Sequence, residues 1–152
     1  MGMVQESIEV DVELSVAYRQ WTRFEDFPRF MEGVEEVTRI DGSRNHWKTR
    51  VAGVSREFDT EIVDQRPDRK IAWHTIGGEV RQMGVVTFDA LDDHRTAVRL
   101  AIDFEPTGVA EKAADLIGVI DRRVKGDLRR FKSFVEQPGT TDDDHPDRPT
   151  PA

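Results

Sequence analysis

The feature that most constrains this chain is a succession of short segments of alternating polarity between Val34 and Glu105. Within each segment, apolar residues occupy every second position, which is the period of a β-strand with one buried face. Turn residues separate the segments at Asp41-Gly42, Gly53, Pro67-Asp68, Gly77-Gly78 and Asp92-Asp93. Because short connections of this kind join antiparallel neighbours, the pattern predicts an antiparallel meander.

The alternation also predicts which side chains share the buried face of the sheet. These positions are Trp47, Thr49, Val51, Phe58, Thr60, Ile62, Ile71, Trp73, Thr75, Val86, Phe88, Val98, Leu100, Ile102 and Phe104. The opposite face carries charged residues such as Lys48, Asp59 and Arg99, so we expect it to be solvated. His46 and His74 each neighbour an inward tryptophan and are therefore predicted to point outward.

Two short helices are predicted between a first strand and the meander. The alternation of Val4, Ile8, Val10 and Val12 with acidic residues marks that strand. Ser15 offers an N-cap for a helix that ends before Asp26. Pro28 suits the first position of a second short helix, which ends at Gly33.

One long amphipathic helix is predicted to follow the meander, from Thr107 as its N-cap to about Glu136. Its apolar stripe consists of Ala113, Ile117, Ile120, Val124, Leu128, Phe131 and Val135. Gly118 and Gly126 weaken this helix and predict either a kink or a close approach to another backbone or a ligand. The order of elements indicates an α+β fold, in which a curved antiparallel sheet wraps around the long helix.

Length and composition predict one domain, residues 1–137, and an acidic tail. A chain of 152 residues is long enough for one sizeable core and too short for two ordinary domains. Residues 138–152 include four prolines and four aspartates, and we expect them to be disordered. The net charge of −8 argues against nucleic acid as a partner.

Several kinds of site and location are disfavoured by what the sequence lacks. There is no cysteine, which excludes disulfides and thiolate chemistry and fits a cytoplasmic protein. No apolar run approaches the length of a transmembrane helix. The four histidines are scattered, so we expect no metal site, and no cofactor motif is recognised.

Several motifs resemble the polyketide cyclase/dehydrase group of the START-like (SRPBCC) superfamily. They are FEDFPRFMEGVEEV, the W-x-x-x-V-A-G of Trp47 to Gly53, QRPDRKIAWHTIGG, GVVTFDAL and DLRRFKSFVE. The likeness spans about Val4 to Glu136 and implies a helix-grip fold with a deep apolar cavity between sheet and helix. Members of this group include aromatase/cyclases and lipid or quinone carriers, so the fold itself selects no reaction.

The leading functional hypothesis is the binding of a hydrophobic small molecule, either aromatic and polyketide-like or lipid-like. Strand alternation and the helix stripe predict a cavity lined by Trp47, Phe58, Trp73, Phe88, Ile102, Ile117 and Ile120, with Phe27, Phe30 and Met31 at its entrance. Aromatic side chains of this kind suit flat ligands. The alternative for each residue is an ordinary place in the packed core.

Two other functions remain open. A polyketide cyclase/dehydratase would use Arg56, which shares the face of Phe58, to stabilise an enolate, and Tyr18 to move protons. Some cyclases of this group carry a tyrosine just after the FPxF-like turn, where this chain has Val34, which weakens that hypothesis. A protein- or membrane-interaction module would use the basic half of the long helix, which contains Arg122, Arg123, Lys125, Arg129, Arg130 and Lys132.

Overall fold

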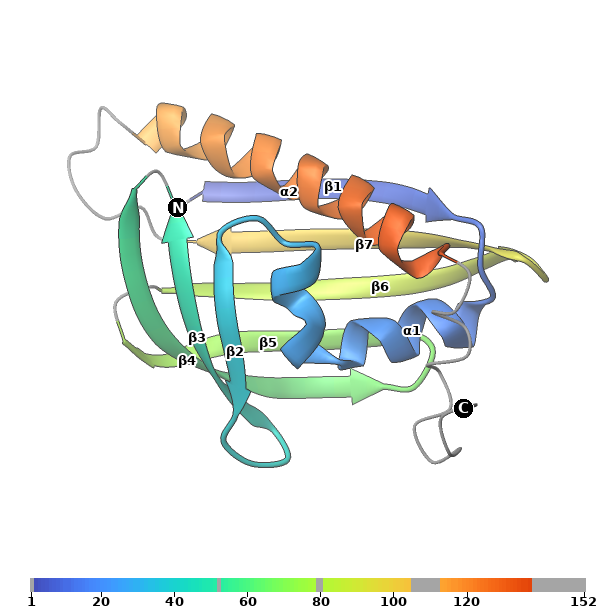
Figure 1. Ribbon diagram of the computed structural model, residues 1–152, viewed down its shortest axis with the longest axis horizontal. Coiled ribbons are helices and arrows are strands. Elements are labelled where there is room, and N and C mark those ends of the chain that lie inside the picture. The colour runs from blue at the N-terminus through green and yellow to red at the C-terminus, as the bar shows by residue number, and fades with distance from the viewer. Residues whose placement is uncertain (1, 52, 79–80, 105–112, 138–152) are drawn as a thin grey trace.

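A seven-stranded antiparallel sheet curls around a long C-terminal helix in the computed structural model, which describes residues 2–51, 53–78, 81–104 and 113–137 (Figure 1). The strands are β1 (Gly2–Val10), β2 (Val34–Arg39), β3 (Arg44–Val51), β4 (Val54–Arg66), β5 (Lys70–Gly78), β6 (Gln82–Asp92) and β7 (Arg95–Phe104). Their order in the sheet is β1-β7-β6-β5-β4-β3-β2. Consecutive strands from β2 to β7 are neighbours, which confirms the predicted meander, and β1 closes the edge beside β7.

Three helical segments lie on the concave face of the sheet (Figure 1). They are α1 (Leu14–Thr22), the 3-10 helix η1 (Phe24–Arg29) and α2 (Ala113–Val135). The predicted α+β helix-grip architecture, with two short helices after the first strand, is therefore confirmed. The acidic tail and the Thr107 cap lie outside the described residues.

The two short helices differ in detail from the prediction. Helix α1 begins at Leu14, so Ser15 lies inside it and is not its cap. The Glu13 carbonyl accepts the N–H groups of Val16 and Ala17, both at 3.1 Å, which starts the helix without a side-chain cap. Pro28 is the fifth residue of η1 and not its first. A pattern of apolar residues predicts that a helix exists more reliably than where it begins.

Helix α2 ends within one residue of the predicted position and runs unbroken through both of its glycines. The atoms nearest to a Cβ added at Gly126 belong to the Arg130 guanidinium of the same helix, at 3.1 Å. At Gly118 the nearest atom is the Arg122 Nη1, at 3.8 Å. Among the described residues, the atoms nearest to both glycines thus belong to arginine side chains of α2 itself and not to the backbone of another element.

The core is densest where α1, η1 and the second half of α2 meet the sheet. Trp21 is 1% exposed, and its ring centroid lies 5.6 Å from that of Phe27, 6.3 Å from Phe88 and 5.0 Å from Phe131. All three contacts are edge-to-face, the arrangement that the ring quadrupole favours. This aromatic cluster joins the two short helices, the sheet and α2 into one core.

The predicted outward direction of the two strand histidines is confirmed. The His46 Nδ1 lies 2.6 Å from the Asp59 Oδ1, and its Nε2 lies 2.8 Å from the Glu57 Oε1. These hydrogen bonds, first that to Asp59 and then that to Glu57, raise the pKa of His46. His74 also faces an acidic residue of the outer face, Glu61, at 3.7 Å. The two histidines thus belong to the charged outer surface.

Candidate functional site

A cavity of about 280 Å³ lies between the concave face of the sheet, η1 and the first half of α2. Aromatic rings form much of its wall. Trp47 and Phe58 are cross-strand partners on β3 and β4, and their rings stack at 5.9 Å with an angle of 7°. Phe27 of η1 packs on Trp47 at 5.6 Å, and Trp73 of β5 extends the wall. The wall of the cavity is therefore largely aromatic.

A glycine on β6 sets the position of the Trp73 indole. Gly84 is the cross-strand partner of Trp73, and a Cβ added there would lie 2.8 Å from the indole Cε2 and Cη2 atoms. Real Cβ atoms do not approach other atoms so closely, so any side chain at position 84 would displace the ring. The absence of a side chain at Gly84 lets the indole lie across the strand.

Most of the sequence-predicted lining residues meet at this cavity. The structure places Phe27, Met31, Trp47, Phe58, Trp73, Ile102 and Ile120 in its wall, together with Arg56. Trp21, Phe24, Val34, Thr49, Ile62, Ile71, Gln82, Leu100, Phe104 and Val124 also line it. Strand alternation identified the correct face because these predicted strand positions point to the concave side of the sheet.

Three predicted lining residues lie elsewhere. Phe30 packs on Phe131 and Phe134, with both pairs of centroids 5.3 Å apart. Phe88 lies in the aromatic core around Trp21. Ile117 is half-buried against the core and is not among the residues that line the cavity. These side chains point to the interior as predicted, but alternation does not tell where along a strand or helix a cavity lies.

Tyr18, the proposed proton shuttle, does not reach the cavity. Its hydroxyl oxygen accepts a hydrogen bond from the Gln65 Nε2 at 2.8 Å. Its ring contacts Phe88 edge-to-face at 5.6 Å. Tyr18 is buried in the α1 side of the core, and it is not among the residues that line the cavity. Only Arg56 of the two predicted catalytic candidates is placed to contact a ligand.

Five polar residues that were not predicted to line the cavity also lie in its wall. They are Glu32, Asn45, Arg81, Arg123 and Asp127. The sequence did carry a signal for two of them. Asn45 shares the strand parity of Trp47, and Asp127 follows Ile120 and Val124 at helical spacing.

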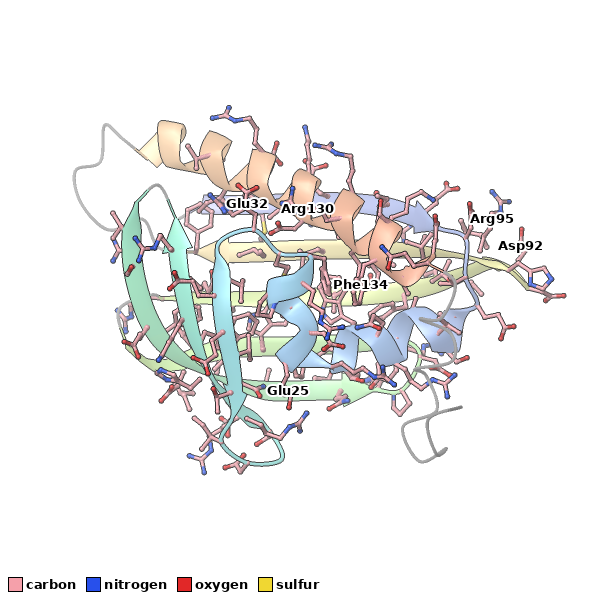
Figure 2. The ribbon with its side chains drawn as sticks, viewed as in Figure 1. Glu25, Glu32, Asp92, Arg95, Arg130 and Phe134 are labelled. Atoms are coloured by element: carbon pink, nitrogen blue, oxygen red, sulfur yellow. The ribbon has the colours of Figure 1, made fainter. Side chains whose placement is uncertain are left out.

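Three side chains of α2 hold the segment Phe30–Gly33, which follows η1. The Arg130 Nε donates to the Phe30 carbonyl at 2.9 Å, and the Arg123 Nη1 donates to the Glu32 carbonyl at 2.7 Å. The Glu32 N–H donates to the Asp127 Oδ1 at 3.0 Å. We call these three hydrogen bonds the clamp. Figure 2 shows Glu32 and Arg130 facing each other across it. Glu32, Arg123 and Asp127 of the clamp also line the cavity on the α2 side.

The carboxyl group of the clamp, that of Asp127, is largely buried. Burial is the largest influence on Asp127 and raises its pKa to about 6, although the Arg130 guanidinium, the Glu32 N–H and the charge of Arg123 oppose the shift. The Asp127 side chain is only 13% exposed, which accounts for the dominance of desolvation. A carboxyl with this pKa can hold or release a proton near neutral pH.

This raised pKa predicts a pH-dependent stability. Between about pH 4 and pH 6 the folded chain binds the Asp127 proton more tightly than the unfolded chain, so the contribution of Asp127 to folding falls as the pH rises. At 1.36 kcal/mol per pKa unit, the free energy of unfolding of the wild type relative to Asp127→Asn should fall by about 2 kcal/mol from pH 4 to pH 7, because at pH 4 the unfolded carboxyl is itself partly protonated. Urea denaturation at several pH values measures this difference.

The control for this measurement is Asp92→Asn. The Asp92 carboxylate is exposed, and hydrogen bonds from the His94 N–H and from Arg95 lower its pKa. The contribution of Asp92 to the free energy of unfolding should therefore rise with pH, whereas that of Asp127 should fall. A relative stability of Asp127→Asn that does not change with pH would mean that the pKa of this carboxyl is not raised.

The basic half of α2 is largely neutralised within the chain. Lys125 contacts Glu6 at 3.8 Å and Asp121 at 3.3 Å. Lys132 contacts Glu136 at 2.6 Å. Arg123 and Arg130 belong to the clamp, which leaves Arg122 and Arg129 as exposed cations of the predicted stripe. The proposed interaction surface is therefore smaller than the sequence suggested.

Residues 2–51, 53–78, 81–104 and 113–137 contain no group of three or more histidine, aspartate or glutamate side chains placed to hold a metal ion. No helix within these ranges has both the length and the apolarity needed to cross a membrane.

The curved sheet and the long helix define a helix-grip fold, and the comparisons with known proteins agree. The family model for polyketide cyclase/dehydrase and lipid transport matches residues 10–132. The chain therefore belongs to the polyketide cyclase/dehydrase and lipid transport family. This confirms the resemblance inferred from the sequence motifs.

One relative and two solved structures illustrate the likeness. The chain is 52% identical over 139 residues to an uncharacterized 17.2 kDa protein from the melC2-rnhH intergenic region of Streptomyces lincolnensis, covering 91% of this chain and 93% of the relative. A START superfamily protein from Mycobacterium smegmatis superimposes with a TM-score of 0.79 at 16% identity, over 90% of this chain and 99% of that chain. The Zhui aromatase/cyclase from a Streptomyces species gives 0.77 at 18% identity, over 88% and 93%.

Proposed function

We propose that this protein binds a flat, hydrophobic small molecule in the cavity between the sheet and α2. The observation that carries the proposal is the stacked pair of Trp47 and Phe58 beside Trp73, which presents aromatic surface to an internal space of about 280 Å³. The family to which the chain belongs is named for lipid transport as well as for polyketide cyclases and dehydrases. Aromatic walls of this kind favour planar apolar ligands over charged ones.

The size of the cavity supports an occupant. At roughly 24 cal/mol per Å³, a cavity of about 280 Å³ corresponds to about 7 kcal/mol of missing packing. The whole stability of a domain is about 5 to 15 kcal/mol. A ligand that fills the space recovers part of this free energy, so binding and folding stability are expected to rise together.

Native mass spectrometry and a neutral fluorescent probe test the proposal. We expect the purified chain to carry a co-purifying small molecule, or after its extraction to bind N-phenyl-1-naphthylamine with saturable fluorescence. Probe binding should also raise the unfolding temperature. A chain that carries no molecule, takes up no probe and shows no thermal shift would refute a ligand-binding function.

A cyclase is the second candidate, favoured by the presence of both Arg56 and Asp127 in the cavity wall. In an aldol cyclisation, a base removes a proton from a methylene group of a poly-β-keto chain. The resulting enolate carbon attacks a carbonyl carbon, and the alkoxide formed there takes up a proton. Arg56 would stabilise the enolate oxygen, and the Asp127 carboxylate would accept the first proton and return it.

The cyclase hypothesis is tested by turnover of a poly-β-keto substrate. Arg56→Ala and Asp127→Asn should each lower kcat, while Tyr18→Phe serves as a control because Tyr18 lies in the core. Equal turnover in all variants, or no turnover in the wild type, would leave the binding function alone.

A further inference from the structure

The exposed fraction of the inward side chains falls along the β3–β4 pair from one end of the cavity to the other. The cross-strand partners on this pair are Thr49 with Arg56, Trp47 with Phe58, and Asn45 with Thr60. Arg56 is half-buried, whereas Asn45 and Thr60 are only 3% and 2% exposed. The pair of Asn45 and Thr60 therefore forms a closed end, beyond the stacked rings.

The closed end contains a buried acceptor without a partner. The Asn45 Oδ1 is inaccessible to solvent and has no hydrogen-bond partner among the described residues. Asn45 nevertheless lies in the cavity wall and on the inward face of β3. A buried carbonyl oxygen that lost its water without gaining a donor is costly, so such a group in a native structure calls for an explanation.

The second polar group at this end is the Thr60 hydroxyl. Its oxygen accepts a hydrogen bond from the Trp47 Nε1 at 2.8 Å, which fixes the indole in the cavity wall. A hydroxyl that accepts still has its own proton to donate. Because Thr60 and Asn45 are direct cross-strand partners on the same face, a donor and an acceptor lie on adjacent side chains at the closed end.

We propose that Asn45 and Thr60 bind the hydroxyl group of a flat hydrophobic ligand, of the phenol or alicyclic alcohol class. The ligand hydroxyl donates to the Asn45 Oδ1 and accepts from the Thr60 hydroxyl, so both groups are satisfied at once. An ether or ketone oxygen accepts from Thr60 but leaves Asn45 without a donor. This inference rests on the proposed binding function and adds the chemical class of the ligand and its orientation, with the hydroxyl at the closed end.

The experiment compares 2-naphthol with 2-methoxynaphthalene by isothermal titration calorimetry. The two probes share a ring system and an oxygen at the same position, but only the naphthol can donate. The wild type should bind 2-naphthol at least tenfold more tightly. Asn45→Leu should reduce this preference to about twofold or less. It should also raise the unfolding temperature of the unliganded protein, because an unsatisfied buried polar group is removed.

Thr49→Val is the matched control for Thr60→Val. Both threonines line the cavity. Thr60 lies on β4 at the closed end, whereas Thr49 lies on β3 and is the cross-strand partner of Arg56 at the other end. Thr60→Val should reduce the preference for the hydroxyl, and Thr49→Val should leave it unchanged.

Two results would overturn the inference, and they differ in what else they imply. Equal affinities of the wild type for the two probes would mean that the closed end does not recognise a hydroxyl, or that water satisfies Asn45, while the binding function would stand. A preference that survives Asn45→Leu would place the hydroxyl elsewhere in the cavity. If neither probe binds and N-phenyl-1-naphthylamine also fails to bind, the proposed function itself is refuted together with the inference.

Discussion

Replacing Trp21 with alanine is expected to lower the free energy of unfolding by about 3 to 5 kcal/mol, the range for deleting a fully buried large aromatic side chain. Trp21 is 1% exposed and contacts three other aromatic rings. Its removal would therefore leave a void that the surrounding rings cannot easily close. The loss is a substantial fraction of the stability of a domain of this size.

The stability loss of Trp21→Ala should be compared with that of Trp73→Ala. Both indoles border the cavity, but Trp73 is only half-buried, so its deletion should cost less than half as much stability. Chemical denaturation of both variants measures the two losses. Equal losses would show that Trp73 packs as tightly as Trp21, and the aromatic wall would then be part of a solid core.

Filling the cavity should abolish ligand binding without unfolding the protein. Ile102 lies on β7 in the cavity wall and is half-buried. A tryptophan there would extend from β7 into the cavity. We expect Ile102→Trp to weaken the binding of N-phenyl-1-naphthylamine at least tenfold, which corresponds to about 1.4 kcal/mol. Its unfolding temperature should stay within a few degrees of that of the wild type, because the added ring occupies space that is empty.

Val63→Trp is the control for this substitution. Val63 is 54% exposed, so a tryptophan at that position adds the same ring outside the cavity. Fluorescence titration should give the wild-type affinity for this variant. Undiminished binding to Ile102→Trp would show that the probe binds at another surface of the molecule.

The sequence predicted the fold well because the burial pattern of the sheet repeats with a simple period. The faces of Trp47, Phe58 and Trp73 follow from alternation alone. The bulge between Ile62 and Asp64 shifts the alternation only beyond the predicted positions of β4, so that Gln65 pairs with Ile71 and donates to the Tyr18 hydroxyl. The order of elements and their turn residues then allowed one arrangement. The same logic identified most of the cavity wall, since the cavity lies against the predicted buried face.

The sequence could not predict which buried positions lie beside the cavity and which fill the core. Phe88 and Trp73 point to the same face of the sheet from neighbouring strands, yet of the two only Trp73 borders the cavity. The difference arises from where α1 and η1 pack along the sheet, and this depends on tertiary contacts. The clamp was equally hidden, because it joins side chains of α2 to backbone atoms of a segment about ninety residues earlier in the chain.

The three α2 side chains of the clamp bind main-chain atoms of Phe30 and Glu32. Every amino acid except proline offers the same carbonyl and N–H groups. The clamp hydrogen bonds therefore do not depend on the side chain of Glu32, whereas Phe30 is also fixed by its buried ring. A substitution of Glu32 can thus change the polar side chain at this part of the cavity wall while the attachment to α2 remains.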